Sequence, residues 1–363
     1  MEEEGIKIHN YGEKISKKLK VFYNKEMKLN RDISLLVINN YFEKSISFCD
    51  PMAASGIREL RFLKTIPDKF KKIVIGDISL EAINDIKKNF KTNKIKLNNI
   101  ELKQDNAINT LSKGYFDFIE IDPYGTPVPF LDIALQRIKH KGILSVTATD
   151  TAALCGTYPK TTLRRYGIKV EKTLWFEEQG LRNLIACCIR EAAKYEKAIT
   201  PVISFTNKHY YKIFFEIEES RTKALEQIKK LSYFTYDKKT QDIKLKKFET
   251  KNSQGKIYVG KLNNKKLLKK MINNLDLIQD KKEIEKLLIK LYNEIDLVGH
   301  YNPHKLEKTH KIHNSIKYEK LIEELKNRKF KVSRAHNNRF GIKTTAKGKD
   351  IVKIIKGNVQ HSK

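Results

Sequence analysis

The stretch DFIEIDPYGTPVPF, residues 117–130, holds an apolar run that stops abruptly. The run up to Ile121 predicts a buried strand, and the chain then turns at DPYG (122–125). Ligands of open α/β sheets bind at the carboxyl ends of the strands. A carboxylate, a rigid ring, an aromatic side chain and a glycine at such an end therefore indicate a functional site.

Similar apolar strands alternate with helical patterns over the first half of the chain. They are SISFC (45–49), KIVIGD (72–77), IELKQD (100–105), FDFIEID (116–122) and ILSVTAT (143–149). This alternation predicts an α/β fold with a parallel, doubly wound sheet. Only three residues separate PVISFT (201–206) from YYKIFFEIE (210–218), too few for a parallel crossover, so we expect an antiparallel terminal hairpin. This layout resembles the class I (Rossmann-like) methyltransferases.

The composition changes after about residue 219, where the chain becomes Lys-rich. Helical spacing recurs at 265–278, 284–298, 318–328 and 346–356, and FKVSRA and FGIKTT read as a hairpin. We therefore predict two domains, an α/β domain over 1–219 and a smaller, basic α+β domain over 220–363. The hairpin is a candidate wing-like contact to nucleic acid.

Charge is the strongest compositional feature, since 363 residues carry a net charge of +30. Such an excess favours a polyanionic partner, because neutralised phosphates release condensed counterions. The alternative is a proteome that is generally rich in Lys. No run approaches the roughly 20 apolar residues of a membrane span, and the amino terminus does not read as a signal peptide. We expect a cytoplasmic protein that binds nucleic acid and no membrane.

Metal binding is not expected. The four cysteines, at 49, 155, 187 and 188, show no C-x-x-C spacing and fit buried, reduced thiols. Histidines concentrate after residue 299, yet no nearby cysteine completes a ligand set. Structural or RNA-facing roles are expected for these histidines.

A cofactor site is indicated by small residues and acids at strand ends. The turn in DPMAASGIREL (50–60) would let a ligand approach the backbone closely. Asp77 and Asp105 end the second and third strands, and Asn106 and Ala107 follow. Acids in these places suit S-adenosylmethionine, whose ribose hydroxyls and amino groups donate hydrogen bonds and whose sulfonium is cationic. The alternative is that each Asp caps the helix that follows it.

The reacting site is assigned to Asp122, Pro123 and Tyr124. Proline fixes the chain direction, and the carboxylate and backbone carbonyls could accept both hydrogens of an exocyclic amine. Tyr124 offers a stacking face for a flipped base, and Gly125 permits close approach. The set fits methylation of an sp² amino group, whose proton must be accepted as the N–C bond forms. The alternative is a plain turn after a buried strand.

Five long motifs resemble those of the tRNA (guanine(26)-N2)-dimethyltransferases. They are FYNKEMKLNRD (22–32), DPMAASGIRELRF (50–62), DPYGTPVPFLDIA (122–134), VTATDTAALCGTYP (146–159) and SRAHNNRFGIKT (333–344). The resemblance implies a catalytic Asp122, with Phe22 and Tyr124 sandwiching the target guanine. It also implies that S-adenosylmethionine is bound by Arg31, Asp50, Arg58, Arg61, Asp77, Ile78, Asp105, Asn106 and Ala107.

The sequence departs from the family pattern in two places. Many relatives carry two C-x-x-C pairs between the domains, whereas residues 233–260 contain no cysteine. A zinc site in that segment is therefore excluded by ligand count. The turn HNNRFG (336–341) differs from the more usual apolar or Pro-containing version, which bears on its RNA contact.

The sequence therefore predicts an enzyme that mono- and then dimethylates N2 of guanosine 26 in tRNA. Residues 1–219 would bind the cofactor and the base, and the basic residues 220–363 would bind the tRNA. No protein partner is indicated. The alternatives are an amino-methyltransferase acting on another RNA or on DNA, and a non-catalytic basic RNA-binding protein.

Overall fold

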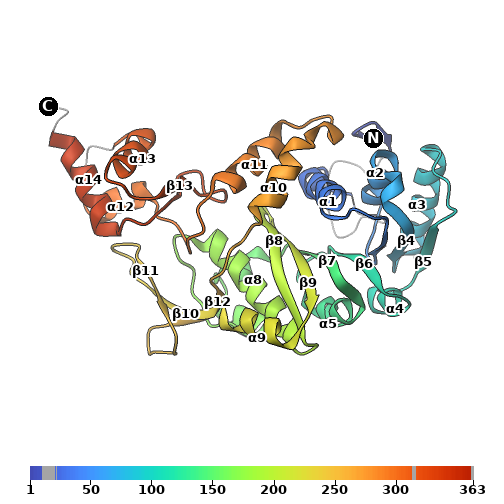
Figure 1. The fold of residues 1–363 in the computed structure, drawn as a ribbon, viewed down its shortest axis with the longest axis horizontal. Helices are drawn as coiled ribbons and strands as arrows, with labels where there is room; N and C mark the ends of the chain where they lie inside the picture. The colour runs from blue at the N-terminus through green and yellow to red at the C-terminus, as the bar shows by residue number, and fades with distance from the viewer. Residues whose placement is uncertain (10–20, 22, 313–315, 361–363) are drawn as a thin grey trace.

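A seven-stranded sheet forms the centre of the molecule, a computed structural model that describes residues 1–9, 21, 23–312 and 316–360 (Figure 1). The strand order is β5-β4-β3-β6-β7-β9-β8. The strands are β3 (Ile46–Asp50), β4 (Phe70–Asp77), β5 (Ile100–Gln104), β6 (Phe116–Ile121), β7 (Ile138–Ala148), β8 (Lys197–Asn207) and β9 (Tyr210–Glu219).

The strand directions confirm the predicted sheet. Strands β3 to β7 are parallel, while β9 pairs antiparallel with both β7 and β8. β4 begins at Phe70, slightly earlier than the predicted start at residue 72. Two other strands begin well before their predicted starts, β7 at Ile138 and β8 at Lys197. In each the register shifts, beside Gly142 in β7 and at Pro201 in β8, and these residues concealed the true start of the strand.

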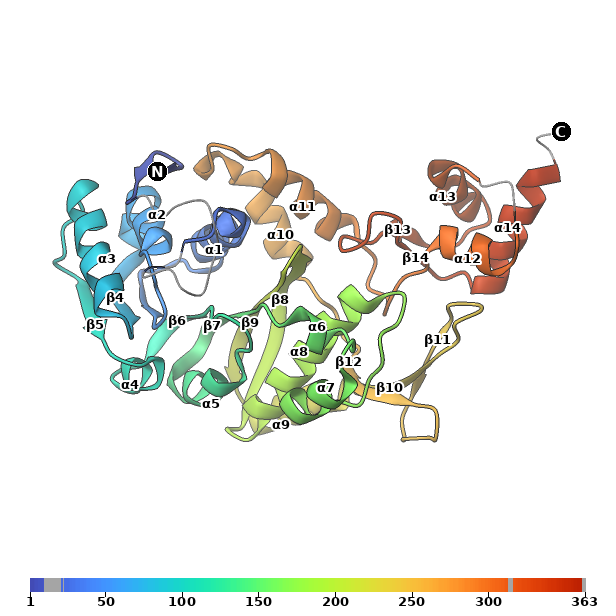
Figure 2. The ribbon, with the colours of Figure 1, turned by 180° about the vertical axis from the view of Figure 1, so that it is seen from behind.

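Helices cover both faces of the sheet because successive strand residues point to opposite sides. Phe48, Ile73 and Phe118 belong to one core, whereas their neighbours Cys49, Val74 and Ile119 belong to the other. The first core is covered by α1 (Lys28–Tyr41), α2 (Ile57–Thr65) and α3 (Leu80–Thr92). The second is covered by α4 (Ala107–Ser112), α5 (Val128–Arg137) and α8 (Phe176–Ala193), on the opposite side (Figure 2).

Smaller elements complete the first part of the chain. The amino terminus forms a short hairpin, and two further helices follow β7 beyond the sheet edge. These elements are β1 (Glu2–Glu3), β2 (Ile6–Lys7), η1 (Lys25–Met27), η2 (Pro67–Lys69), α6 (Thr151–Leu154), α7 (Pro159–Tyr166) and α9 (Arg221–Lys229). Among the described residues no helix has the length and apolar character needed to cross a membrane.

The remaining residues divide into three groups. A three-stranded antiparallel sheet of order β11-β10-β12 contains β10 (Leu231–Tyr236), β11 (Ile243–Lys246) and β12 (Gln254–Tyr258). Next come α10 (Lys265–Asn273), η3 (Leu275–Leu277) and α11 (Lys282–Asn293). The last group contains α12 (Pro303–Thr309), α13 (Tyr318–Asn327), β13 (Val332–Arg334), β14 (Ile342–Thr344) and α14 (Gly348–Gln360), and its antiparallel β13–β14 pair confirms the predicted hairpin.

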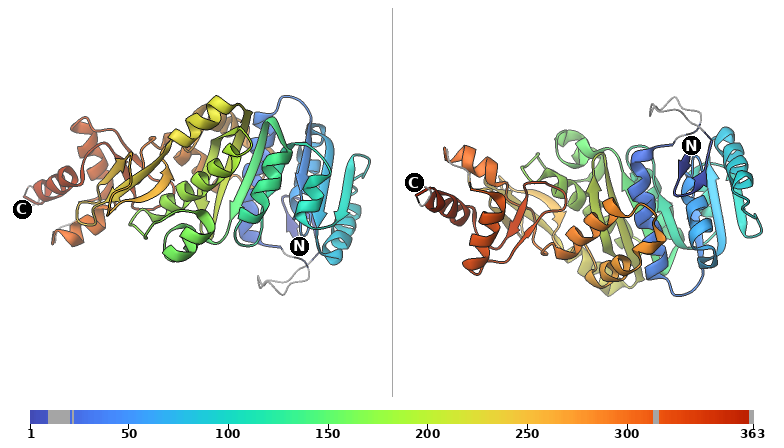
Figure 3. Two further views of the ribbon diagram at one scale, coloured as in Figure 1. Left: turned by 90° about the horizontal axis from the view of Figure 1, so that it is seen from below. Right: turned by 90° about the horizontal axis from the view of Figure 1, so that it is seen from above.

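Only the last group has a core of its own. Leu306, Leu321 and Ile355 belong to a separate cluster. The elements of this group lie at the carboxyl-terminal end of the molecule (Figure 3). In contrast, Leu268 and Leu288 of α10 and α11 join the core around α1. The division at residue 219 stays a prediction, and the cores show that the segment after it packs closely onto the first part of the chain.

Candidate active site

Four acids line the carboxyl edge of the parallel strands. Asp50 and Asp77 are the last residues of β3 and β4, and Asp105 and Asp122 directly follow β5 and β6. Because these strands are neighbours in the order β5-β4-β3-β6, the acids succeed one another along a single edge. This arrangement joins the candidate cofactor site to the DPYG turn.

The DPYG turn is fixed against the end of β7. Gly125 N–H donates to Thr149 Oγ1 over 2.7 Å, and Thr149 N–H donates to Gly125 O over 2.9 Å. Gly125 adopts φ of 106°, a conformation that side chains disfavour. Pro123 is buried while Tyr124 is 64% exposed. The turn therefore presents an aromatic side chain outward beside a rigidly held carboxylate.

Arg58 of α2 lies beneath this turn. Its guanidinium forms an ion pair with Asp122 Oδ2 and lies 3.3 Å from Glu120 Oε2. It lies 3.5 Å from Asp50 Oδ2 and donates to Asn30 Oδ1 over 3.0 Å. One buried arginine thus fixes the direction of the Asp122 side chain, while Asp122 Oδ1 accepts no hydrogen bond from the residues described.

A buried Glu–Lys pair extends these contacts across the sheet. Glu120 of β6 and Lys212 of β9 are fully buried and joined by an ion pair. Lys212 Nζ also donates to Thr147 Oγ1 over 3.0 Å. Burial alone would raise the pKa of Glu120, but Arg58 and Lys212 lower it. We call Arg58, Glu120, Asp122 and Lys212 the site network.

Asp77 organises the turn between β3 and α2. Its carboxylate accepts hydrogen bonds of 2.9 Å from the N–H groups of Ala54 and Ser79. Gly56 has φ of 70°, and a Cβ there would approach Ile86 to 2.9 Å, so the turn requires glycine. Next to Asp77, Ile78 is 74% exposed. An exposed apolar side chain beside an acid offers a surface for an adenosyl group.

Asp105 begins the neighbouring loop. It accepts hydrogen bonds of 2.9 Å from Asn109 Nδ2 and 2.8 Å from Lys113 Nζ, and the Lys113 bond is the main cause of its lowered pKa. The helix caps are Ser79 for α3 and Asn106 for α4. Asp77 and Asp105 are therefore not the N-caps that the alternative interpretation required. Ala107 is buried at the start of α4.

Arg31 and Arg61 meet a carboxylate from the amino terminus. Arg31 Nε donates to Glu3 Oε1 over 2.8 Å, and Arg61 Nη1 lies 3.2 Å from the same oxygen. Arg61 also pairs with Asp32. Burial would raise the pKa of Glu3, but Arg31 and Arg61 lower it. The two arginines are 4% and 2% exposed, so their part in cofactor binding stays a prediction.

Sequence reasoning missed Glu3, Glu120 and Lys212. A usable signal existed for Lys212, because alternation in YYKIFFEIE places it on the same strand face as Tyr210 and Phe214. A lysine at such a position needs a buried partner. Phe22, the predicted second stacking residue, lies outside the described residues.

Comparison with known proteins decides the family. The family model described as N2,N2-dimethylguanosine tRNA methyltransferase matches residues 2–356. The chain belongs to this family. It is therefore a tRNA methyltransferase, which confirms the predicted family and enzyme class.

Individual relatives agree with this assignment. The tRNA (guanine(26)-N(2))-dimethyltransferase of Methanococcus maripaludis is 34% identical, covering 96% of this chain and 95% of the relative. That of Pyrococcus furiosus is 33% identical, covering 93% of each. The solved complex of Trm1 from Pyrococcus horikoshii with S-adenosyl-L-methionine has a TM-score of 0.88 at 30% identity, over 96% of this chain and 97% of that one. The α/β methyltransferase fold is thereby confirmed.

The edge of the sheet in this family member fits S-adenosylmethionine. Asp77 and Asp105 are carboxylates of the type that accepts hydrogen bonds from hydroxyl and amino groups, and they lie in the loops next to the sharp turn at Gly56. Ile78 supplies an apolar surface. The acids also favour a positively charged sulfonium. These side chains belong to three adjacent loops of one edge.

The segment predicted to lack zinc forms the β11-β10-β12 sheet. In the described part of the chain, no group of three or more His, Cys, Asp and Glu side chains is placed to hold a metal ion. Cys187 and Cys188 are buried in α8 as packing residues.

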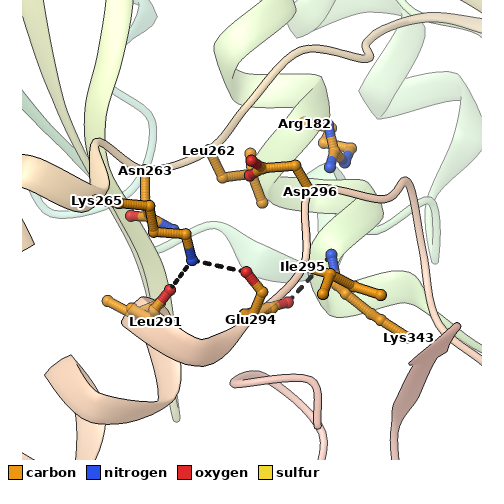
Figure 4. A pocket seen from close by; sticks show the side chains of 9 residues that line it. All are labelled: Arg182, Leu262, Asn263, Lys265, Leu291, Glu294, Ile295, Asp296 and Lys343. Carbon is orange, nitrogen blue, oxygen red and sulfur yellow. Dashed lines mark hydrogen bonds and ion pairs between the residues drawn. The ribbon is translucent and has the colours of Figure 1, made fainter. Parts of the chain in front are cut away.

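A small pocket lies elsewhere, where α8, α11 and β14 meet (Figure 4). Beside it Lys343 lies 2.8 Å from Glu178 and 3.1 Å from Glu294, and Arg182 lies 2.7 Å from Glu178. Burial would raise the pKa of Glu178, but Lys343 and Arg182 lower it to about 2. We call Glu178, Arg182, Glu294 and Lys343 the junction network. It joins the last group of elements to the sheet.

Proposed function

We propose that this methyltransferase uses S-adenosylmethionine to convert guanosine 26 of tRNA into N2-methylguanosine and then N2,N2-dimethylguanosine. The observation that carries this proposal is the position of Asp122. Its Oδ2 is held by Arg58 and its Oδ1 accepts no hydrogen bond from a described residue, beside an exposed Tyr124. Similar proteins named tRNA (guanine(26)-N(2))-dimethyltransferase support the choice of nucleotide.

The reaction needs a group that orients the exocyclic amine and accepts its proton. We assign this role to Asp122, whose fixed carboxylate would accept a hydrogen bond from N2–H and direct the nitrogen lone pair away from the ring. Pro123 removes a backbone N–H from the turn, so a backbone carbonyl there could accept the second amine hydrogen. Tyr124 would stack on the guanine.

S-adenosylmethionine supplies an electrophilic methyl group when it is bound. As the nitrogen forms its new bond to carbon, one N–H bond breaks and its proton passes to Asp122. After the first methylation one N–H remains. The same carboxylate can accept this hydrogen, provided that the amine rotates to place its methyl group away from Asp122.

The other assignments are parts of the same proposal. Asp50, Asp77, Ile78, Asp105, Asn106 and Ala107 form the cofactor edge, with Arg31, Arg58 and Arg61 behind it. The catalytic unit is assigned to residues 1–219, and residues 220–363 are assigned to tRNA binding. Cytoplasm is the location we assign, since tRNA is the substrate of the family.

The test is mass spectrometry of nucleosides after incubation of unmodified tRNA with the protein and S-adenosylmethionine. Mono- and then dimethylguanosine should accumulate in sequence. A tRNA with adenosine at position 26 should gain neither product. Equal methylation of that tRNA, or of a DNA competitor, would refute the assigned target.

A further inference from the structure

The segment 158–172, which contains α7, runs next to the DPYG turn. Tyr166 O–H lies 2.9 Å from Thr126 Oγ1, directly after the turn, and donates to Asp150 over 2.6 Å. Arg165 also holds Asp150, over 2.9 Å. These contacts fix α7 beside the residues assigned to the target base.

The outer surface of α7 is basic and aromatic. Tyr158 is 60% exposed, and Lys160 and Arg164 are exposed four residues apart, on one face of the helix. Among the described residues, the side chains of Lys160 and Arg164 form no hydrogen bond or ion pair. Two exposed cations and an exposed aromatic ring therefore belong to the segment whose Tyr166 is held against Thr126 and Asp150.

The segment after α7 continues to the second sheet. Gly255 N–H donates to Lys169 O over 2.9 Å, and Glu171 N–H donates to Gln254 Oε1 over 2.8 Å, so the segment ends against β12. The same sheet carries an exposed Lys247 close to the ring of Phe248, which is 72% exposed. The segment after α7 thus connects the neighbourhood of the DPYG turn with the β11-β10-β12 sheet, which begins the Lys-rich part of the chain (Figure 2).

We propose that Tyr158, Lys160 and Arg164 bind the tRNA backbone immediately beside the modified nucleotide. This inference rests on the proposed function and adds a contact surface within residues 1–219. A base displaced toward Asp122 leaves its flanking phosphates at the rim of the site, where cations compensate their charge. Tyr158 supplies a face on which a neighbouring unpaired base can stack.

The test compares two matched double variants of the full-length protein. Lys160→Ala with Arg164→Ala removes the α7 charges. Lys87→Ala with Lys91→Ala removes an exposed pair of the same spacing from α3, which lies at the opposite edge of the sheet. The measured quantities are the tRNA dissociation constant at several salt concentrations and the dissociation constant of S-adenosylmethionine.

The α7 variant should bind tRNA about tenfold more weakly at physiological salt, and its log–log salt slope should fall by about 2. The α3 variant should change neither quantity appreciably. Cofactor affinity and the single-turnover rate at saturating tRNA should be retained in both. Tyr158→Ala should weaken tRNA binding at high salt as well, since stacking is not screened.

Equal tRNA affinity and salt slope in the α7 and α3 variants would overturn the inference. So would an equal loss of cofactor binding, which would indicate damage to the fold. The proposed function is judged separately. Wild-type protein that makes dimethylguanosine supports it even if the α7 variant binds tRNA normally, and wild-type protein that makes none refutes it.

Discussion

The site network and the junction network contain the same kind of buried ion pairs, but they differ in the exposure of one carboxylate. In each, a fully buried glutamate is shared between two cations, Glu120 between Arg58 and Lys212, and Glu178 between Arg182 and Lys343. Each also joins separate elements of the chain. Buried ion pairs of this kind specify an arrangement more than they stabilise it, since desolvation offsets much of the attraction.

The two networks differ in the exposure of one carboxylate in each, Asp122 in the site network and Glu294 in the junction network. Asp122 has 15% of its side chain exposed beside the DPYG turn, while Glu294 is only 5% exposed and is held by Lys343 and by His336. Both carboxylate oxygens of Glu294 thus have cationic partners in the junction network, whereas the site network ends at a carboxylate that is partly exposed. Both networks therefore contain buried charged groups, and the partly exposed carboxylate of Asp122 is the feature that indicates a catalytic role for the site network.

Asp122→Asn should have the largest effect on activity. The amide keeps the shape but loses the basicity and the charge, so the single-turnover rate at saturating cofactor should fall about 10²–10⁴-fold. Asp105→Asn is the matched control at the same edge, and it should weaken cofactor binding while the saturated rate is kept. A rate within a few-fold of wild type for Asp122→Asn would mean that DPYG is only a turn.

Lys343→Met should break the junction network instead. It removes one of the two partners of Glu178 and one of the two partners of Glu294, and breaking a buried ion pair in this way commonly costs about 3–5 kcal/mol of unfolding free energy. Denaturant unfolding measures this loss, and Lys347→Met, at an exposed lysine on the same segment, should stay within about 0.5 kcal/mol of wild type. If the folded Lys343 variant also lost its single-turnover rate, the two networks would not be separable.

The sheet could be predicted from the sequence because its strands carry a local signal. Apolar runs bounded by helical patterns predicted seven strands and the antiparallel pair of β8 and β9, whereas the pairing of β9 with β7 and the starts of β4, β7 and β8 were not predicted. The packing of α10 and α11 on α1 could not be predicted in this way. That contact joins segments more than 200 residues apart, and nothing in a local pattern specifies it.

The sequence predicts which acids lie at the carboxyl edge of the sheet, but it does not predict the contacts of the buried side chains behind that edge. Asp77, Asp105 and Asp122 follow strands, and that position alone places them together. Arg58 was expected to contact the cofactor, and in the structure it binds Asp122. Choosing between these partners requires the position of α2 over β6, which depends on the packing of the whole sheet.

His300 provides a pH test of the region around the junction network. It is 3% exposed, and its two ring nitrogens have no hydrogen-bond partner among the described residues. Burial lowers its pKa to about 4, although Glu178 and Glu294 oppose the shift, while Lys343 and His336 favour it. In the unfolded chain His300 takes up a proton near pH 6.5, whereas in the folded chain it stays neutral until about pH 4. The unfolding free energy therefore decreases as the pH falls through this range.

The contribution of His300 to the unfolding free energy, measured as the difference between wild type and His300→Leu, should accordingly fall by about 2 kcal/mol between pH 7 and pH 5. Glu178 and Glu294 contribute little above pH 5, because their pKa values are lowered in the folded state and lie near 4.5 in the unfolded chain. Burial raises the pKa of Glu59 to about 7, so this carboxyl takes up a proton in the folded state over the same range and opposes the fall in stability. His300→Leu should flatten this part of the profile. The same slope in wild type and variant would assign the proton uptake to another histidine.

Tyr124 tests the exposed end of the site network with the smallest expected effect. Stacking on one aromatic side chain is worth about 1–3 kcal/mol per base, and the low end is expected here because Phe22 is predicted to cover the other face of the guanine. Tyr124→Ala should therefore raise the tRNA KM about five- to tenfold, while Tyr124→Phe, which keeps the ring, should stay near wild type. Cofactor affinity should not change, since Tyr124 follows β6 and the cofactor is assigned to the loops after β3, β4 and β5. If Tyr124→Phe were as impaired as Tyr124→Ala, the hydroxyl and not the ring would be the contributing group, and the exposed end of the network would act by hydrogen bonding.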